Sequence, residues 1–305
     1  MKRAHLIFNP EARGVTPALV RVMIAALETR YKLDSTFTRA RDAGVEVARQ
    51  AAADGNELIV AFGGDGLVNE VVNGIIGTEV ALAIIPGGTM NVFARNIGIP
   101  RDPLDAADRL LIENLTTTSF RPAKVDDRYF TFACGCGFDA EAATKVESNK
   151  PTKRRIGEPY FYMAAMTTFL GSYFVKKPFL SVEVGGRQIP AVMAIALNGE
   201  TYAYLAGRPV KLAGPSTKRL RGGEVKEHSI ELFTLKRLKY HHVPNYLLGA
   251  VLTGKFGPDA NVTETSGPVV VSADKPFSIH VDGEPLHPRS RAELSAGDAE
   301  ISLVV

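Results

Sequence analysis

Apolar residues in the first third of the chain alternate between short continuous runs and segments with helical spacing. Residues 6–8, 58–62 and 80–85 form continuous apolar runs, and residues 33–37 alternate between apolar and polar positions, so each predicts a strand. Helix-length segments with apolar residues three and four apart separate these strands, as at residues 19–27. This order predicts right-handed βαβ units and a parallel sheet that helices cover on both faces.

Beyond about residue 121 the pattern changes to short strand-like runs. They lie at residues 129–133, 180–184, 191–197, 229–235, 269–272 and 277–281. Gly185-Gly186 marks a hairpin turn, and helical spacing returns near residues 160–173 and 240–252. We therefore expect an α/β domain followed by a mostly antiparallel β domain. Since no long linker separates them, we expect the domains to abut, with the active site in the cleft between them.

Composition narrows the class of protein without naming a function. The chain has 305 residues, 45% hydrophobic and 23% charged, which is typical of a folded protein with two cores. Its net charge of +3 is too small to indicate a nucleic-acid partner. Cys134 and Cys136 are expected to be reduced thiols on one face of a strand. We find no secretory signal and no segment apolar enough to span a membrane, so we expect a reducing cytoplasm.

Residues 63–66, Gly-Gly-Asp-Gly, lie between a predicted buried strand and a helix. Glycines there let the backbone approach a ligand, and the unpaired N–H groups of a helix N-terminus favour an anion. Further along the helix, Asn69, Glu70 and Asn73 share a polar face opposite an apolar one. The same residues are also consistent with a tight turn in which Asp65 only caps the helix.

Two more strand ends carry unusual turns. Residues 86–91, Pro-Gly-Gly-Thr-Met-Asn, close the next predicted strand, and residues 9–14 at the end of the first strand include Asn9, Arg13 and Gly14. The carboxyl ends of parallel strands meet at one edge of a sheet, so these turns set anion-receptive loops side by side. An arginine is well matched to phosphate oxygens. Together the three turns predict a site for a nucleotide with a polyphosphate tail.

Several familiar motifs are absent. The chain has no Gly-x-x-x-x-Gly-Lys-Ser/Thr P-loop, no His-Arg-Asp or Asp-Phe-Gly signature and no Gly-x-Ser-x-Gly turn. The dinucleotide fingerprint is broken, because Asn69 stands where its third glycine is needed. These absences exclude P-loop NTPases, protein kinases of the common type and the obvious serine hydrolases.

Two longer segments carry a family resemblance. Residues 63–74 read Gly-Gly-Asp-Gly-Leu-Val-Asn-Glu-Val-Val-Asn-Gly, and residues 86–95 read Pro-Gly-Gly-Thr-Met-Asn-Val-Phe-Ala-Arg. With Asn9-Pro10, Gly137-Phe138-Asp139-Ala140 and Asp282-Gly283-Glu284 in the family's order, the chain resembles the diacylglycerol kinase and sphingosine kinase catalytic family.

The resemblance implies a fold and its domain boundaries. It implies an N-terminal parallel α/β domain like those of NAD kinases and diacylglycerol kinases, followed by an antiparallel β-sandwich domain. We expect the first at residues 1–121, with residues 290–305 returning to it, and the second, which would take the lipid substrate, at residues 122–289.

The resemblance also implies ATP and Mg²⁺, with transfer of the γ-phosphoryl group to a lipid hydroxyl. The expected nucleotide contacts lie at strand ends or on the following helix face: Asn9, Thr38, Gly63, Gly64, Asp65, Gly66, Asn69, Glu70, Gly87, Gly88, Thr89 and Asn91. Asp65 is the candidate to hold Mg²⁺, through water, because Mg²⁺ keeps much of its hydration in proteins. Capping of the helix by Asp65 is compatible with that role.

Asp282-Gly283-Glu284 follows the predicted strand at residues 277–281. An Asp-Gly pair is usually no more than a hairpin turn. Its place in the family's order makes one of the two carboxylates a candidate general base for the lipid hydroxyl. We favour Glu284 as the proton acceptor, with Asp282 assisting, so the expected catalytic residues are Glu284, Asp282 and Asp65.

The chain departs from the bacterial family pattern at three positions. Leu67 replaces a usual Thr, Val92 replaces an Asp after the second motif, and Arg121 stands where another family Asp is expected. The two lost carboxylates belong to a network thought to organise the metal. Besides Asp65, the expected metal ligands are Glu224 and Glu227, which would form a changed ancillary metal site.

The sequence gives weaker indications of where a lipid would bind. Residues 160–174 are rich in aromatic residues and methionine and are followed by Lys176-Lys177, which is compatible either with core or with an acyl-chain entrance at a membrane. Basic runs at residues 150–155 and 218–221 would suit either solvent or an anionic leaflet. We expect peripheral, transient membrane contact, a lipid partner, a homodimer among the possible assemblies, and no nucleic acid.

We therefore expect a cytoplasmic, ATP-dependent lipid kinase of phospholipid metabolism that acts on a diacylglycerol-like or sphingoid lipid. An NAD kinase-like enzyme is the alternative within the same fold, because NAD kinases share the Gly-Gly-Asp-Gly turn. The alternative from another class is a nucleotide-binding regulatory protein with weak or lost catalysis. It is suggested by Val92 and Arg121, which replace two carboxylates of the family.

Overall fold

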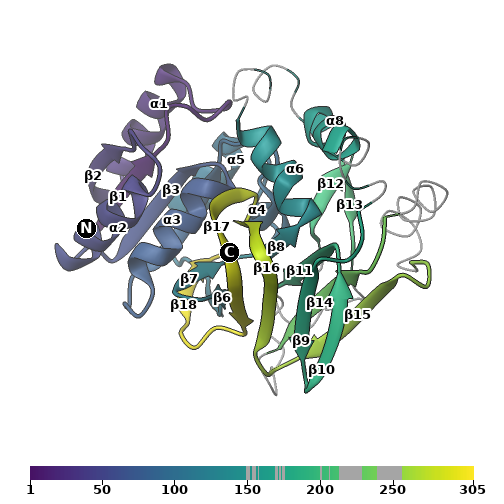
Figure 1. The fold of residues 1–305 in the computed structure, drawn as a ribbon. Coiled ribbons are helices and arrows are strands. Elements are labelled where there is room, and N and C mark those ends of the chain that lie inside the picture. Colours follow the sequence, from purple (N-terminus) through teal and green to yellow (C-terminus); the bar gives the residue numbers. More distant parts are fainter. Residues whose placement is uncertain are drawn as a thin grey trace. The chain divides into compact units, whose positions relative to one another are not determined.

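The computed structural model describes two compact units. The described residues are 1–148, 152, 156, 158–168, 171, 173, 176–199, 201–205, 207–212, 229–238 and 256–305. Unit 1 consists of Met1–Pro122 and Asp298–Val305, and unit 2 consists of Ala123–Gly297. Each unit is described separately below (Figure 1).

Unit 1 contains a six-stranded sheet in the order β2-β1-β3-β4-β18-β5. Its strands are β1 (Lys2–Phe8), β2 (Tyr31–Phe37), β3 (Leu58–Gly63), β4 (Ala81–Pro86), β5 (Thr117–Phe120) and β18 (Ile301–Val304). All neighbours are parallel except β18 and β5. Every residue of β3 is buried, which explains its continuous apolar run. The predicted parallel α/β fold is confirmed.

Helices of unit 1 follow the strands as the hydrophobic spacing predicts. They are α1 (Pro17–Glu28), α2 (Ala43–Ala53), α3 (Asp65–Ile75), α4 (Val92–Asn96) and α5 (Pro103–Asp108), with a short 3₁₀ turn at Arg109–Leu111. Thr16 caps α1, since its side chain accepts a hydrogen bond from the Leu19 amide, and Pro17 occupies the first turn. Val20, Met23 and Leu27 then form the buried face of α1.

The end of the chain returns to unit 1 as β18, between β4 and β5. The returning segment is shorter than expected. Residues 290–297 were expected to go with it, but β17 (Glu284–Ser295) continues through this stretch and pairs with β16 (Val269–Val281) of unit 2. The chain passes to unit 1 only at Asp298.

Unit 2 is built on a ten-stranded sheet whose strands pair antiparallel. Besides β16 and β17, its strands are β6 (Ala123–Val125), β7 (Arg128–Phe130), β8 (Ala133–Gly137), β9 (Leu180–Val184), β10 (Arg187–Ala191), β11 (Met193–Leu197), β14 (Ile230–Leu235) and β15 (Ala260–Thr265). A separate pair consists of β12 (Ala203–Leu205) and β13 (Arg208–Val210), and the described part of the unit includes the helices α6 (Phe138–Glu147) and α8 (Glu158–Thr168). The predicted antiparallel β domain is confirmed.

The predicted Gly185-Gly186 hairpin is also confirmed. These two residues join β9 to β10, and Val184 pairs directly with Arg187. Both glycines have positive φ, 54° and 74°, as a two-residue hairpin loop requires.

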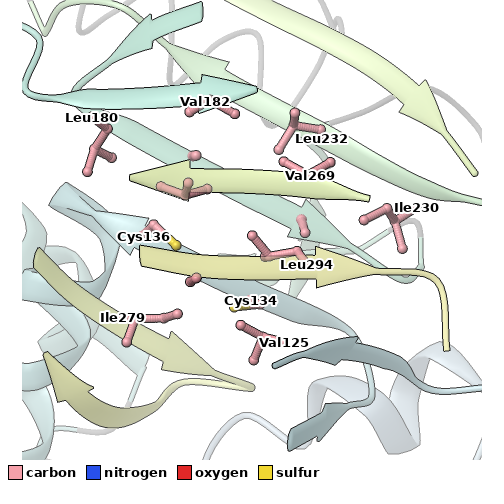
Figure 2. Close-up of a cluster of buried hydrophobic side chains, with 14 of the residues drawn as sticks. Val125, Cys134, Cys136, Leu180, Val182, Ile230, Leu232, Val269, Ile279 and Leu294 are labelled. Atoms are coloured by element: carbon pink, nitrogen blue, oxygen red, sulfur yellow. The ribbon is translucent and has the colours of Figure 1, made fainter. Parts of the chain in front are cut away.

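The long strand β16 lets the sheet of unit 2 fold over one core. Its first part, Val269–Ser272, pairs with β9, whereas Ile279–Val281 pairs with β8. Register shifts between these parts mark bulges, which bend a strand. Figure 2 shows the resulting core, with side chains from β8, β9, β14, β16 and β17 pointing toward one another.

Both cysteines lie in this core, as free thiols. They sit two residues apart on β8 and therefore share a face of the strand, as predicted. Burial raises the pKa of the Cys134 thiol well above its usual value. Both side chains are fully buried among apolar residues and act as small core residues.

The predicted helix at residues 240–252 and the basic stretch at residues 218–221 lie outside the described residues. Within the described part of the chain, no helix has the length and apolar character needed to cross a membrane.

Candidate functional site

Three loops follow β1, β3 and β4 at the same edge of the unit 1 sheet, and backbone hydrogen bonds join them. The Asn9 amide donates to the Phe62 carbonyl (3.1 Å) at the end of β3. The Gly87 amide donates to the Gly63 carbonyl (2.7 Å), and the Gly14 amide donates to the Gly87 carbonyl (2.8 Å). The loops that the sequence predicts to lie side by side are thus one bonded assembly, which we call the strand-end loops (residues 9–16, 63–65 and 86–91).

The glycines of the strand-end loops are needed for close approach between the loops. A Cβ added at Gly88 would lie 2.5 Å from the Gly64 Cα, and one added at Gly87 would lie 2.6 Å from the Val15 Cγ2. Neither contact is possible without moving the backbone or its neighbour. Since Gly64 and Gly88 are not among the residues with positive φ, backbone conformation does not explain them. The sequence pattern suggested approach to a ligand, and the structure adds contact between neighbouring loops as a cause.

Asn91 and Asp65 hold the loop after β4 in place. Asn91 adopts a left-handed conformation (φ 46°), and its side chain accepts from the Gly88 amide and donates to the Gly88 carbonyl, both at 2.9 Å. Asp65 begins α3, and its Oδ1 accepts a hydrogen bond from the Phe93 amide (3.1 Å) in the first turn of α4. Asp65 therefore caps the neighbouring helix α4.

The other predicted nucleotide contacts differ in their surroundings. The Asn9 Oδ1 accepts from the Glu11 amide, and Thr38 is buried at the end of β2 with its amide bonded to the Phe8 carbonyl. Asn69 is buried on α3 and accepts from the Asn73 side chain. Thr89 is partly exposed in the loop after β4.

Glu70 has a structural role that the sequence did not indicate. Its two carboxylate oxygens accept hydrogen bonds from the Asp42 and Gly44 amides, both at 2.8 Å, at the start of α2. Asp42 itself makes no side-chain cap there. A carboxylate also stabilises the positive end of a helix dipole. Glu70 thus supplies from α3 the cap that α2 lacks, and its contact with the nucleotide stays a prediction.

Replacing Glu70 with Ala should lower the free energy of unfolding by about 1–2 kcal/mol, because two amides of α2 lose their acceptor. Glu70→Gln keeps one acceptor oxygen and should cost less. Urea denaturation followed by circular dichroism measures both, with Glu28→Ala at the exposed end of α1 as a control. Equal midpoints for Glu70→Ala and the control would contradict the capping role.

Asp282 and Gly283 form the two-residue loop of the β16–β17 hairpin. Val281 pairs directly with Glu284, and Asp282 and Gly283 have positive φ values of 49° and 82°. The simple reading of the Asp-Gly pair as a hairpin turn is therefore correct as far as the backbone is concerned.

The Asp282 carboxylate also fastens the hairpin to the start of β8. It is buried and accepts four hydrogen bonds: from the Thr131 amide (2.7 Å), the Thr131 hydroxyl (2.9 Å), the Phe132 amide (2.9 Å) and the Ala133 amide (3.1 Å). A carboxylate offers about four acceptor positions. Asp282 uses these positions within unit 2 and so has a structural role there; its assisting role in proton transfer stays a prediction. Glu284, the first residue of β17, is only half-buried.

A buried group of polar residues next to this hairpin was missed by the sequence analysis. The His280 Nε2 lies 2.5 Å from the Asp139 Oδ2, and the Gly283 amide donates to the His280 Nδ1 (3.2 Å). The Tyr202 hydroxyl donates to the other Asp139 oxygen. The only available signals were Asp139 in the family motif and a histidine inside an apolar strand, and neither indicates its partner.

The described residues offer no resident metal site. In that part of the chain, no three His, Cys, Asp or Glu side chains come together in a group that could hold a metal ion. Glu224 and Glu227 lie outside the described residues. Asp65 is one carboxylate at a strand end, and Mg²⁺ typically uses one or two protein carboxylates together with substrate phosphates. Asp65 therefore fits a metal that arrives with a nucleotide.

The three departures from the family pattern take structural places. Leu67 and Val92 are buried, at 4% and 3% exposure, in α3 and at the start of α4. Arg121 forms an ion pair with Glu300 in unit 1. Leu67 therefore packs where a hydroxyl was expected. Of the two expected carboxylates, one is replaced by the buried Val92 and the other by Arg121 in a surface ion pair.

The aromatic and methionine-rich segment is partly described. On α8, Tyr160 and Ala164 are buried against Val146 of α6, whereas Met163 and Met166 are exposed. Tyr173 is buried, and its hydroxyl donates to Glu141 (2.5 Å); burial and this carboxylate raise its pKa. The basic residues Lys150, Lys153, Arg154 and Arg155 lie outside the described residues.

Comparison with known proteins decides the family. Residues 3–121 match the family model described as the diacylglycerol kinase catalytic domain. Residues 3–121 belong to the diacylglycerol kinase catalytic-domain family. This domain contains all three strand-end loops. It ends at residue 121, next to Pro122, the last residue of the first segment of unit 1.

Relatives of this family match well beyond the catalytic domain. The diacylglycerol kinase of Bacillus subtilis (strain 168) is 29% identical over 292 residues, which are 93% of this chain and 90% of that protein. The diacylglycerol kinase of Staphylococcus aureus (strain JH9) is 33% identical over 222 residues, which are 70% of this chain and 64% of that protein.

Solved structures support the fold. A diacylglycerol kinase from Bacillus anthracis str. Sterne matches with a TM-score of 0.68 and 19% identity, over 99% of this chain and 96% of that chain. An NAD kinase from Archaeoglobus fulgidus in complex with ATP matches with a TM-score of 0.52 and 13% identity, over 99% and 93%. The diacylglycerol kinase catalytic domain therefore has here the fold that it shares with NAD kinases.

Proposed function

We propose that the protein is an ATP-dependent lipid kinase that phosphorylates the hydroxyl of a diacylglycerol-like lipid. The observation that carries the proposal is the bonded set of strand-end loops inside a diacylglycerol kinase catalytic domain. The relatives named above are diacylglycerol kinases, and the alignment with the B. subtilis protein spans most of both chains. A sphingoid lipid is the second acceptor to test.

In this proposal the strand-end loops hold the phosphates of ATP. Backbone amides near Gly64 and Gly88 and the side chains of Asn9, Thr89 and Asn91 are the expected donors. The hydrogen bonds among the loops fix the backbone before the nucleotide binds. Such preorganisation lowers the cost of binding and keeps the charged tail in one position.

Mg²⁺ is proposed to arrive with ATP, where it would neutralise charge on the phosphates. Asp65 is the residue proposed to face it, because it begins α3 at the end of β3. The bond from the Phe93 amide to Asp65 Oδ1 holds the carboxylate in one orientation. The strand-end loops would bind the phosphates of ATP, and a separate carboxylate would act on the lipid hydroxyl.

Transfer requires the lipid hydroxyl oxygen to attack the γ-phosphorus as the bond to the β-phosphate oxygen breaks. The products are ADP and a lipid phosphate, and the hydroxyl proton must leave the oxygen. We propose that the Glu284 carboxylate accepts this proton. Its place at the start of β17, directly after the anchored hairpin, holds its backbone in position.

The experiment uses purified protein with radiolabelled ATP, Mg²⁺, and diacylglycerol, sphingosine or NAD as acceptor. Label in phosphatidic acid supports the proposal. Label in NAD alone would mean an NAD kinase-like enzyme, and ATP binding without transfer to any acceptor would mean a regulatory protein; both results contradict the proposal.

Asp65→Asn is the matched variant for this experiment. It keeps an oxygen to accept the hydrogen bond from Phe93 but removes the charge. We expect lipid phosphorylation to fall by about tenfold to a hundredfold with an unchanged melting temperature, since charge-assisted contacts are worth about 1.5–3 kcal/mol. Normal turnover by Asp65→Asn would remove Asp65 from the proposed metal role.

A further inference from the structure

His280 lies on the face of the unit 2 sheet opposite the hydrophobic core. Its neighbours Ile279 and Val281 belong to the core, so His280 points to the other face, which α6 contacts. The His280 side chain is 2% exposed and that of Asp139, in the first turn of α6, is 13% exposed. A buried imidazole of this kind needs partners for both ring nitrogens.

Both ring nitrogens have partners, and these determine where the proton lies. A backbone amide can only donate a hydrogen bond, so the Gly283 N–H requires a lone pair on the His280 Nδ1. The ring proton must then sit on Nε2, from which it is donated to the Asp139 Oδ2. The contacts therefore specify the neutral Nε2–H form of His280.

A glycine on the neighbouring strand leaves the space that the pair occupies. Gly135 on β8 pairs directly with His280, and an added Cβ at Gly135 would lie 2.1 Å from the Asp139 Oδ2 and 2.3 Å from the His280 Nε2. Gly137 has a φ of 82° and begins α6, which places Asp139 over the strand. The Tyr202 hydroxyl binds the other Asp139 oxygen and so fixes the orientation of the carboxylate.

We propose that Asp139 and His280 are positioning residues for phosphoryl transfer: Asp139 fixes the Nε2–H form of His280, whose Nδ1 then holds the Gly283 amide and with it Glu284. The inference rests on the proposed function, because the hairpin matters for catalysis only if Glu284 accepts the proton of the lipid hydroxyl. His280 is not itself the base, since both of its nitrogens are engaged. The Tyr202 hydroxyl is a further titratable group in hydrogen-bond contact with this pair, through the Asp139 Oδ1.

Two substitutions of His280 separate its two hydrogen bonds. His280→Gln places an amide donor near the position of Nε2 and keeps the bond to Asp139, but offers Gly283 no acceptor. His280→Asn places an oxygen near the position of Nδ1 and keeps the acceptor for Gly283. We expect kcat to fall about tenfold to a hundredfold in His280→Gln, with an unchanged KM for ATP, and to stay within about threefold of wild type in His280→Asn.

Asp139→Ala tests the other end of the chain of hydrogen bonds. It removes the acceptor that selects the Nε2–H form and should lower kcat as His280→Gln does. His287→Gln, at an exposed position of β17, is the control and should change neither kcat nor the melting temperature. Equal losses of kcat in His280→Gln and His280→Asn, in proportion to their losses of stability, would overturn the positioning role.

A spectroscopic measurement tests the inference without any substrate. ¹⁵N NMR of the histidine rings distinguishes the two neutral forms, and the signal of His280 is assigned by its loss in His280→Asn. We expect the Nε2–H form in the wild type and a shift toward the Nδ1–H form in Asp139→Ala. A wild-type ring in the Nδ1–H form would overturn the inference. If the wild type phosphorylates no lipid, the proposed function is contradicted, but the NMR measurement still tests the hydrogen bonds of His280.

Discussion

Glu284→Gln should lower kcat for lipid phosphorylation by about a hundredfold to ten-thousandfold, because a glutamine cannot take the proton from the attacking hydroxyl. The KM for ATP should stay unchanged, since Glu284 is not among the residues proposed to bind the nucleotide. Steady-state kinetics with diacylglycerol in mixed micelles gives both parameters. A loss confined to kcat indicates an interaction that matters only in the transition state.

The same substitution elsewhere on β17 is the control for Glu284. Glu293 is exposed and forms a surface ion pair with Arg291 (3.2 Å). Such pairs contribute about 0–1 kcal/mol, so Glu293→Gln should behave as the wild type. If Glu284→Gln retained full activity while the wild type phosphorylates lipid, the proton would have to go elsewhere, and Asp282 would return as the candidate.

Asp282→Ala should destabilise the protein by about 3–5 kcal/mol. It leaves three backbone amides and the Thr131 hydroxyl of a buried segment without their acceptor, and each unsatisfied buried donor costs about 1–3 kcal/mol. It also forces a Cβ-bearing residue without a polar side chain into a positive φ. Urea denaturation followed by circular dichroism measures the loss.

Two further variants separate these causes. Asp282→Gly removes the strain but not the lost hydrogen bonds, so it should recover only about 1 kcal/mol. Asp282→Asn keeps one acceptor oxygen and a residue type that tolerates positive φ, and should be the least destabilised of the three. If Asp282→Ala were as stable as the wild type, the four hydrogen bonds to Asp282 would contribute nothing to stability, and its structural role would be wrong.

The parts of the site that depend on local pattern could be predicted from the sequence. Glycine-rich turns after continuous apolar runs indicated strand ends, and the carboxyl ends of parallel strands necessarily meet at one edge. The proximity of Gly14, Gly64 and Gly88 follows from that geometry alone. The hairpin at Gly185-Gly186 was equally local, because positive φ at two successive residues is a property of the turn itself.

The parts that depend on distant partners could not be predicted. Glu70 and the α2 N-terminus are 28 residues apart, and Asp139 and His280 are 141 residues apart. On a helix face, a glutamate that caps a neighbouring helix has the same pattern as one that binds a ligand. Likewise, the four donors to Asp282 come from residues 131–133, and nothing in the Asp-Gly pair indicates them.

The position of β18 between β4 and β5 affects the order in which the protein can fold on a ribosome. Strands β4 and β5 emerge early, but the strand that joins them follows only after the whole of residues 123–297 has been synthesised. During that interval both strands have an unsatisfied edge, which is a template for wrong pairing. Unit 1, which we propose to bind ATP, therefore completes its sheet only after unit 2 has been synthesised, so nascent chains should acquire affinity for ATP late in translation.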